Sequence, residues 1–174
     1  MNERKNLPLP PLEKLKEYLD YNPDTGVIIW KKKTSVKARI KIGQEAGSVN
    51  GKGYRIIHFK NKDYLAHRLA YYMYHGIDPL EKMLDHENLN KQDNWIKNLR
   101  LATRPENGRN RGPNKNNTSG VTGVYWHKTA QKWQAQIMVN GKTKYLGLYI
   151  NKEDAIQARK EAEKKYFGKF RRKD

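Results

Sequence analysis

The sequence contains no cysteine. This absence excludes disulfide scaffolds, thiol nucleophiles and every zinc or iron–sulfur site with cysteine ligands. Long apolar runs are also lacking, and the segment MNERKNLPLPP at the start is not an apolar signal segment. No helix pattern has a broad apolar face beside a basic one, so we expect no membrane partner. Together these absences predict a soluble, cytoplasmic protein.

Acidic residues are scarce relative to basic ones. The 174 residues include 36 Lys and Arg against 18 Asp and Glu, which gives a net charge of +18. Repulsion of this size opposes compaction, so a polyanion such as nucleic acid is the expected partner. Apolar residues make up only 36% and the mean hydropathy is -1.05, yet aromatic residues reach 10%. This balance differs from that of a disordered basic tail and favours two small aromatic-rich cores over one large core.

Apolar spacing predicts short helices and strands in the first half of the chain. In order these are a helix at 12–19, strands at 27–30, 54–59 and 64–66, and a helix at 67–75. Gly76 is expected to end the second helix. Residues 31–41 form a basic loop with no clear pattern. The histidines of this half, at positions 58, 67 and 75, are interpreted as structural.

Residues 83–111 show the order strand, long polar loop, strand and short helix. Asp85 and His86 stand at the end of the first strand. A carboxylate oxygen suits a hard cation such as Mg²⁺, and a neutral imidazole accepts a proton from water near its ordinary pKa. Asn98 is placed to fix the imidazole through its side-chain carbonyl. Asn107 is placed to supply a second oxygen ligand from the helix.

Other interpretations of this loop stay open. An Asp- and Asn-rich stretch is most often a solvated turn, and an isolated Asp–His pair is weak support for catalysis. A calcium loop fits poorly, because counting from Asp85 the sixth residue is Asn90 rather than Gly and the twelfth is Ile96 rather than Glu. The position of the pair in a strand–loop–strand–helix unit of a strongly basic chain favours a catalytic site.

Several short motifs follow one another between residues 21 and 111. They are residues 21–27 and 46–48, His67-Arg68-Leu69-Ala70, Leu84-Asp85-His86, Asp93-Asn94, Asn98-Leu99-Arg100, Asn107 and Asn110-Arg111. In this order and with these gaps they resemble the HNH endonucleases of the phage homing type. The resemblance covers roughly residues 12–111. It implies a ββα-metal nuclease site and a phage-infected or host bacterial cell as the location.

The resemblance assigns a role to each polar residue of the site. It implies that Asp85 and Asn107 bind the metal, with one ion per active site, and that His86 is the general base oriented by Asn98. Asn107 stands where many members have His, and an amide oxygen favours Mg²⁺ or Mn²⁺ over zinc. The implied reaction is hydrolysis of a phosphodiester bond in double-stranded DNA.

Further expectations concern the phosphate and the number of strands cut. Arg100 and Arg104 are the candidates for steadying the phosphate. One active site per chain favours nicking of a single strand, and no dimer seam or protein partner is evident, so a monomer is expected.

The C-terminal segment contains SGVTGVYW, KWQAQI, KYLG and EDA, followed by Ala158. Over residues 119–168 this pattern resembles the plant ethylene-response-factor (Apetala-type) DNA-binding domain, which implies a three-stranded sheet in the major groove with one helix behind it. Alternation independently places Trp133, Ala135, Ile137 and Val139 toward the helix. Trp126 and Trp133 are expected in the core. The outward face expected to contact DNA comprises Tyr125, His127, Gln134, Gln136, Met138, Thr143 and Tyr145.

The sequence thus predicts an α+β protein with an HNH nuclease domain at residues 1–107, whose ββα-metal core spans about 83–111. A basic linker at 108–118 leads to a small three-stranded antiparallel sheet packed on one helix at 119–174. Arg109, Arg111 and Lys115 of the linker region are expected to follow the DNA backbone. The predicted function is a site-specific DNA endonuclease. The alternatives are a non-catalytic, sequence-specific DNA-binding regulator and an RNA-binding protein.

Overall fold

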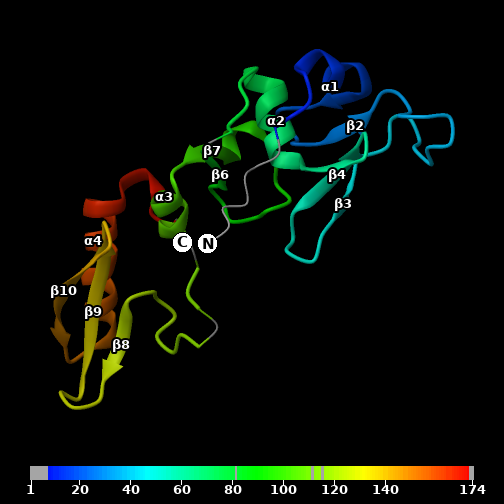
Figure 1. Cartoon of the computed structure of the whole chain (residues 1–174). Helices are drawn as coiled ribbons and strands as arrows, with labels where there is room; N and C mark the ends of the chain where they lie inside the picture. Colours follow the sequence, from blue (N-terminus) through cyan, green and yellow to red (C-terminus); the bar gives the residue numbers. More distant parts are fainter. Residues whose placement is uncertain (1–7, 81, 111, 115, 173–174) are drawn as a thin grey trace. The chain divides into compact units, whose positions relative to one another are not determined.

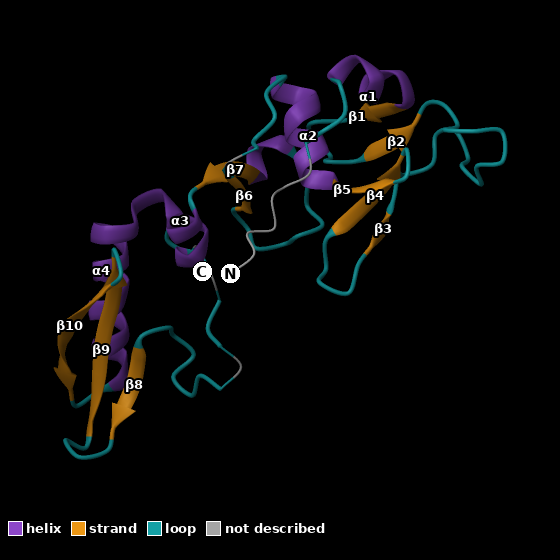
Figure 2. Cartoon of the chain, in the orientation of Figure 1, coloured by secondary structure: helices purple, strands orange, loops and turns teal. Residues whose placement is uncertain are grey.

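The computed structural model describes residues 8–80, 82–110, 112–114 and 116–172. The chain forms two compact units, Met1–Arg104 and Pro105–Asp174. The division falls shortly before residue 107, where the sequence analysis ended the first domain. Each unit combines helices with antiparallel strands, as expected of an α+β fold (Figure 2). Among the described residues, no helix is both long and apolar enough to cross a membrane.

The first unit begins with a helix that leads directly into a strand. Helix α1 (Leu12–Tyr18) starts after Pro11, whose carbonyl accepts a hydrogen bond from the Leu15 amide. Strand β1 (Leu19–Tyr21) then pairs antiparallel with β2 (Ile28–Trp30). Between them, the Asn22 side chain accepts hydrogen bonds from the next backbone amides and fixes a tight turn.

A second sheet supports the helix that follows it. Its strand order is β3 (Ser48–Val49), β4 (Arg55–Phe59) and β5 (Lys62–Leu65), all antiparallel. Helix α2 (Ala66–His75) continues directly from β5 and ends at Gly76 in the left-handed conformation, as predicted. The core of this unit comprises Leu15, Leu19, Ile28, Trp30, Ala46, Ile57, Phe59, Tyr64, Ala66, Leu69, Ala70, Met73 and Leu99.

The remaining elements of this part of the chain carry the candidate site. Strand β6 (Met83–His86) pairs antiparallel with β7 (Leu99–Ala102). A polar loop and the short 3₁₀ helix η1 (Ile96–Asn98) join the two strands. Helix α3 (Arg104–Arg109) follows β7 and spans the boundary between the two units (Figure 1).

The second unit is a three-stranded sheet with one helix on its face (Figure 1). The sheet order is β10 (Lys142–Tyr149), β9 (Lys132–Val139) and β8 (Val124–His127). Helix α4 (Lys152–Phe167) packs mainly on β9 and β10 and continues into the 3₁₀ helix η2 (Gly168–Phe170).

The local predictions for β9 are confirmed. Ala135 and Ile137 are fully buried, each in an apolar cluster that includes residues of α4. Asn140 and Gly141 both have positive φ, at 52° and 77°, which suits a two-residue hairpin turn.

The expectation that Trp126 belongs to the core is wrong. Its side chain is 45% exposed, whereas Trp133 opposite it is half-buried against the apolar cluster. Trp126 lies near the end of the short edge strand β8, and α4 packs mainly on the other two strands. The two indole rings instead meet edge to face, with centroids 5.5 Å apart.

Candidate active site

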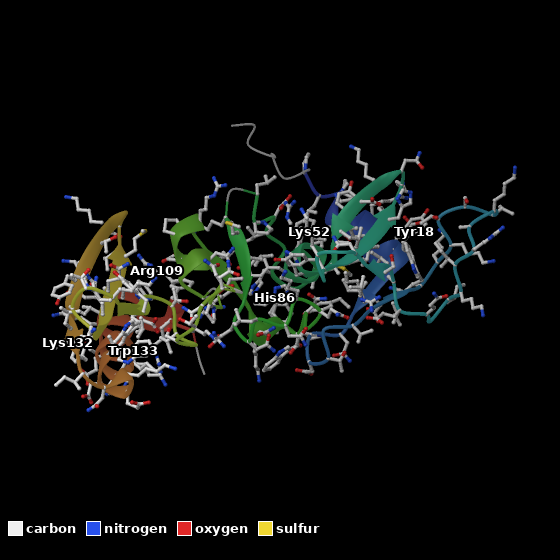
Figure 3. All side chains as sticks on the ribbon, turned by 90° about the horizontal axis from the view of Figure 1, so that it is seen from below. Tyr18, Lys52, His86, Arg109, Lys132 and Trp133 are labelled. Carbon is white, nitrogen blue, oxygen red and sulfur yellow. The ribbon has the colours of Figure 1, made fainter. Side chains whose placement is uncertain are left out.

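Asp85 and His86 lie side by side at the end of β6, and both are buried, each with 5% exposure. Antiparallel pairing sets Asp85 opposite Arg100 and His86 opposite Leu99 on β7. The carboxylate of Asp85 also acts electrostatically on the imidazole and favours its protonated form. Figure 3 labels His86 within its unit.

The imidazole of His86 is held by Asn94. The His86 Nε2 atom lies 3.1 Å from Asn94 Oδ1 within a buried environment. An amide oxygen only accepts hydrogen bonds, so this contact places the imidazole proton on Nε2 and the lone pair on Nδ1. Burial lowers the pKa of His86, and the neighbouring Asn94 and Asp85 oppose this only in part. The ring is therefore neutral near pH 7 and able to accept a proton.

Asn98 does not make the contact with His86 that the sequence analysis expected. Its Oδ1 atom accepts a hydrogen bond from the Asn88 amide at 3.0 Å, and its Nδ2 donates to the Asp93 carbonyl at 2.7 Å. Backbone groups of a loop folded against the protein need partners, and Asn98 supplies two of them. Its side chain thus ties both arms of the loop together, and Asn94, next to Asp93, takes the position beside the imidazole.

The turn between β1 and β2 supports the same loop from the other side. The Tyr21 hydroxyl donates to the Asn94 carbonyl at 2.8 Å, and the Ile96 amide donates to the Pro23 carbonyl at 2.9 Å. Gly26, at a φ of 77°, packs so closely that a Cβ atom there would lie 2.3 Å from the Trp95 nitrogen. The sequence analysis used residues 21–27 as part of the family resemblance and did not connect them with the site loop.

A second buried histidine packs on the first. His67, near the start of α2, meets His86 edge to face with ring centroids 5.0 Å apart, and Tyr54 lies 5.4 Å from His67. Burial lowers the pKa of His67 to about 3, and the nearby His86 and Arg68 contribute. His67 is therefore a neutral packing partner of the candidate base, in agreement with its structural interpretation.

Arg100 faces Asp85 across the strand pair. Its Nε and Nη2 atoms donate to Asp85 Oδ2 at 2.9 and 2.8 Å. Both side chains are largely buried, with exposures of 15% and 6%. Two charge-assisted hydrogen bonds neutralise the carboxylate. A cation bound to the same oxygen would therefore compete with the guanidinium.

The donor atoms suit a hard cation. Asp85 offers a carboxylate, and Asn107 on α3 carries an amide oxygen beyond the unit boundary. Among the residues that the structure describes, no three His, Cys, Asp or Glu side chains gather as in an all-protein metal cage. Mg²⁺ does not need such a cage, because one or two carboxylates, waters and substrate phosphates complete its shell. The metal-binding roles of Asp85 and Asn107 remain predictions.

The arginines expected to contact DNA lie in different environments. Arg104 is exposed at the start of α3. Arg109 packs over the Phe167 ring, with its guanidinium 5.2 Å from the ring centre, within the second unit. Arg111 and Lys115 lie outside the described residues.

The outward face of the second sheet is polar and aromatic. Tyr145 and Met138 are 61% and 62% exposed, and strand pairing sets them opposite Gln136 and Thr143. Tyr125 accepts a hydrogen bond from Gln134 Nε2 at 2.6 Å.

His127 is an exception within that set of expected contacts. Its Nδ1 atom accepts a hydrogen bond from the Ala130 amide at 3.1 Å, so that nitrogen is used inside the turn between β8 and β9. Only the remaining edge of the ring is left for a contact with DNA.

Comparison with known proteins supports the nuclease interpretation for the site region. Residues 64–109 match the family described as HNH endonuclease. The matched segment contains β6, the polar loop and β7 with Asp85, His86, Asn94 and Asn98, so the site geometry lies in a segment similar to nucleases that act on DNA.

A curated relative comes from a bacteriophage. The chain is similar to "Protein 3.8" of Escherichia phage T7, with 36% identity over 67 residues. The aligned region covers 38% of this chain and 55% of that protein. No solved structure gives a significant match.

Proposed function

We propose that this protein is a metal-dependent DNA endonuclease of the HNH type. The observation that supports the proposal best is the buried Asp85–His86 pair, whose imidazole is fixed by Asn94 within the segment that matches HNH endonucleases. A solvated turn, the main alternative for this loop, does not account for a neutral imidazole held by one amide and packed against a second buried histidine.

In this proposal His86 is the general base. With its proton on Nε2 and bonded to Asn94, the ring presents Nδ1 to a water molecule and takes a proton from it. Asp85 and Asn107 hold one Mg²⁺ or Mn²⁺ ion, which when bound offers positive charge to a phosphate oxygen and the leaving 3′ oxygen. Hydrolysis then yields a 5′-phosphate and a 3′-hydroxyl.

Arg100 has two tasks in the proposed reaction. Without a cation it neutralises the buried Asp85, which would otherwise be a costly isolated charge. In the proposed reaction the guanidinium would also contact a phosphate of the substrate, together with the exposed Arg104.

The second unit is proposed to bind and position the DNA. Its segment 124–174 carries 13 Lys and Arg against five Asp and Glu, a net charge of +8. Its exposed face opposite α4 presents amide and tyrosine groups, which suit contacts with base edges and phosphates. Like the Apetala-type domain that it resembles, this sheet is proposed to enter the major groove, while the different side chains give a different target sequence. A monomeric, homing-type enzyme that nicks one strand completes the proposal.

The direct test is cleavage of a supercoiled plasmid library that carries randomised inserts. We expect open circles with Mg²⁺ or Mn²⁺, none with a chelator, and none from His86→Ala. The matched control is His58→Ala, because His58 is exposed and pairs only with Asp63 on the neighbouring strand. Cleavage by His86→Ala at the wild-type rate would remove the basis of the mechanism. Metal-independent tight DNA binding without cleavage would instead favour the regulator.

A further inference from the structure

The loop between β2 and β3 is the most basic exposed segment of the first unit. Residues 31–41, called the basic arm below, contain Lys31, Lys32, Lys33, Lys37, Arg39 and Lys41 and no acidic residue. All six side chains are exposed. Six positive charges without a negative one repel each other, so the arm costs free energy unless a polyanion binds there.

The fold holds both ends of the arm in place. The Trp30 amide donates to the Gln44 carbonyl at 3.0 Å, and the Gly43 amide donates to the Trp30 carbonyl at 2.8 Å. Within the arm, the Ala38 amide donates to the Ser35 carbonyl at 3.1 Å. The hydrogen bonds of Trp30 with Gly43 and Gln44 therefore close the loop at its base, and the basic side chains lie beyond that closure. Figure 1 shows the loop projecting beyond β2, away from β6 and β7 of the same unit.

Two of the arm's lysines have partners, whereas the others face solvent. Lys31 donates to the Lys16 carbonyl, and Lys32 forms an ion pair with Glu17 at 2.7 Å. Among the described residues, the side chains of Lys33, Lys37, Arg39 and Lys41 form no hydrogen bond or ion pair. These four groups are therefore available for an external anion.

Lysines from neighbouring elements extend the positive surface around the base of the arm. The ammonium groups of Lys14, Lys32 and Lys60 lie 5.3, 5.2 and 5.8 Å from the centre of the Tyr18 ring. Glu17 pairs with Lys14 and Lys32, and its hydrogen bonds with these two lysines lower its pKa to about 2. The three lysines and this ionised carboxylate together carry a net charge of +2 near neutral pH.

We propose that the basic arm, with the lysines around Tyr18, binds the phosphate backbone of duplex DNA at a distance from the cleaved bond. Figure 3 labels Tyr18 toward the end of the unit that carries the arm, and His86 nearer the opposite end. The exposed apolar residues here, Val36 in the arm and Ile42 just after it, are isolated and do not form the continuous apolar face that a membrane surface requires. Residues 31–41 contain no aromatic residue on which a base could stack, and such a lysine-rich segment suits phosphates better than single-stranded bases.

The arm's contribution has a measurable size. Each phosphate neutralised by a lysine or arginine contributes about 0.9 to the slope of log K against log salt for duplex DNA. Replacing Lys33, Lys37 and Lys41 should therefore lower that slope by about 2.7 if each makes one contact. Because the contacts lie away from the scissile bond, the change should raise KM and leave kcat at saturating DNA unchanged.

The experiment measures duplex binding by the full chain in chelator, at several salt concentrations, so it does not depend on cleavage. Lys33→Gln/Lys37→Gln/Lys41→Gln is compared with Lys164→Gln/Lys165→Gln/Lys169→Gln, a control with the same charge loss on exposed lysines of the second unit. We expect the lower slope from the arm variant alone. Each single substitution, for which loss of folding is no concern, should lower the slope by about 0.9.

Two outcomes would overturn the proposal. An equal loss of slope in both triple variants would show a general charge effect. An unchanged duplex slope with weakened binding to single-stranded RNA, or to vesicles with anionic lipid, would assign the arm to that partner. The proposal for the arm rests on the proposed endonuclease function in one respect, because it takes duplex DNA to be the substrate. If the arm variant lowers the salt slope as expected but the wild-type chain never cuts DNA, the proposed nuclease function is refuted. The proposed binding of duplex DNA by the arm is then retained.

Discussion

Replacing Asn94 with Ala tests how the fold prepares His86 for catalysis. The substitution removes the Asn94 side-chain oxygen that accepts the His86 Nε2 proton, at 3.1 Å in a buried environment. Leaving a buried donor unsatisfied costs about 1–3 kcal/mol. If that cost falls on the productive tautomer and ring orientation, each 1.36 kcal/mol lowers the rate about tenfold. We therefore expect kcat to fall by roughly 5- to 160-fold.

The assay is single-turnover cleavage of a duplex that contains a mapped site, at saturating protein. Asn90→Ala is the matched control, because Asn90 lies in the same loop but is exposed, and its side chain accepts a hydrogen bond from the nearby Gln92 amide rather than contacting His86. Thermal unfolding of both variants separates a loss of orientation from a loss of folding. A rate for Asn94→Ala within twofold of the control would refute the role of Asn94.

The pH profile of Asn94→Asp sharpens the same test. A carboxylate in place of the amide favours the protonated imidazole and raises the pKa of His86, whereas burial lowers it in the native site. The base acts only when neutral, so the acidic limb of the rate profile should move to higher pH. An acidic limb that stays in place in Asn94→Asp would show that His86 is not the base, or that residue 94 does not contact it.

Three further predictions follow from neighbouring contacts. Arg100→Gln should bind Mn²⁺ more tightly than wild type in calorimetry without DNA, since the guanidinium competes for Asp85 Oδ2, and weaker binding would count against it. Gly26→Ala should lower the free energy of unfolding by more than about 2 kcal/mol, since φ is 77° and its Cβ would meet the Trp95 backbone; an unchanged melting temperature contradicts this. The pKa of His67 is about 3 in the fold and near 6.5 unfolded, so protons bind the unfolded chain more tightly. Stability should fall by about 2 kcal/mol from pH 7 to pH 5 in wild type and by clearly less in His67→Gln.

Much of the fold could be predicted because the relevant information is local. The alternation of residues 133–139 identifies which face of β9 is buried, and Asn140-Gly141 identifies its hairpin turn. Gly76 likewise marks the end of α2. In each case a period or a backbone conformation is encoded within a few residues, and no distant contact is needed to decide it.

The details of the site depended on distant contacts and could not be read in this way. The loop after His86 contains several asparagines of similar local character, and the chain reverses at Leu89 with a φ of 64°. Which of them faces the imidazole depends on that path, so Asn94 took the place expected for Asn98. Trp126 was misplaced for a related reason, because local alternation does not tell how far α4 extends across the sheet.

The segment similar to HNH endonucleases does not by itself hold the loop of the candidate site in place. Residues 64–109 contain Asp85, His86 and Asn94, yet the Asn94 backbone is held by Tyr21 and the next turn by Pro23, both outside that segment. Close packing at Gly26 links the same turn to the loop. The orientation of the imidazole is therefore a property of the whole first unit. The same turn leads through β2 into the basic arm, so the segment proposed to bind the DNA backbone is joined by one short strand to the turn that holds the site loop.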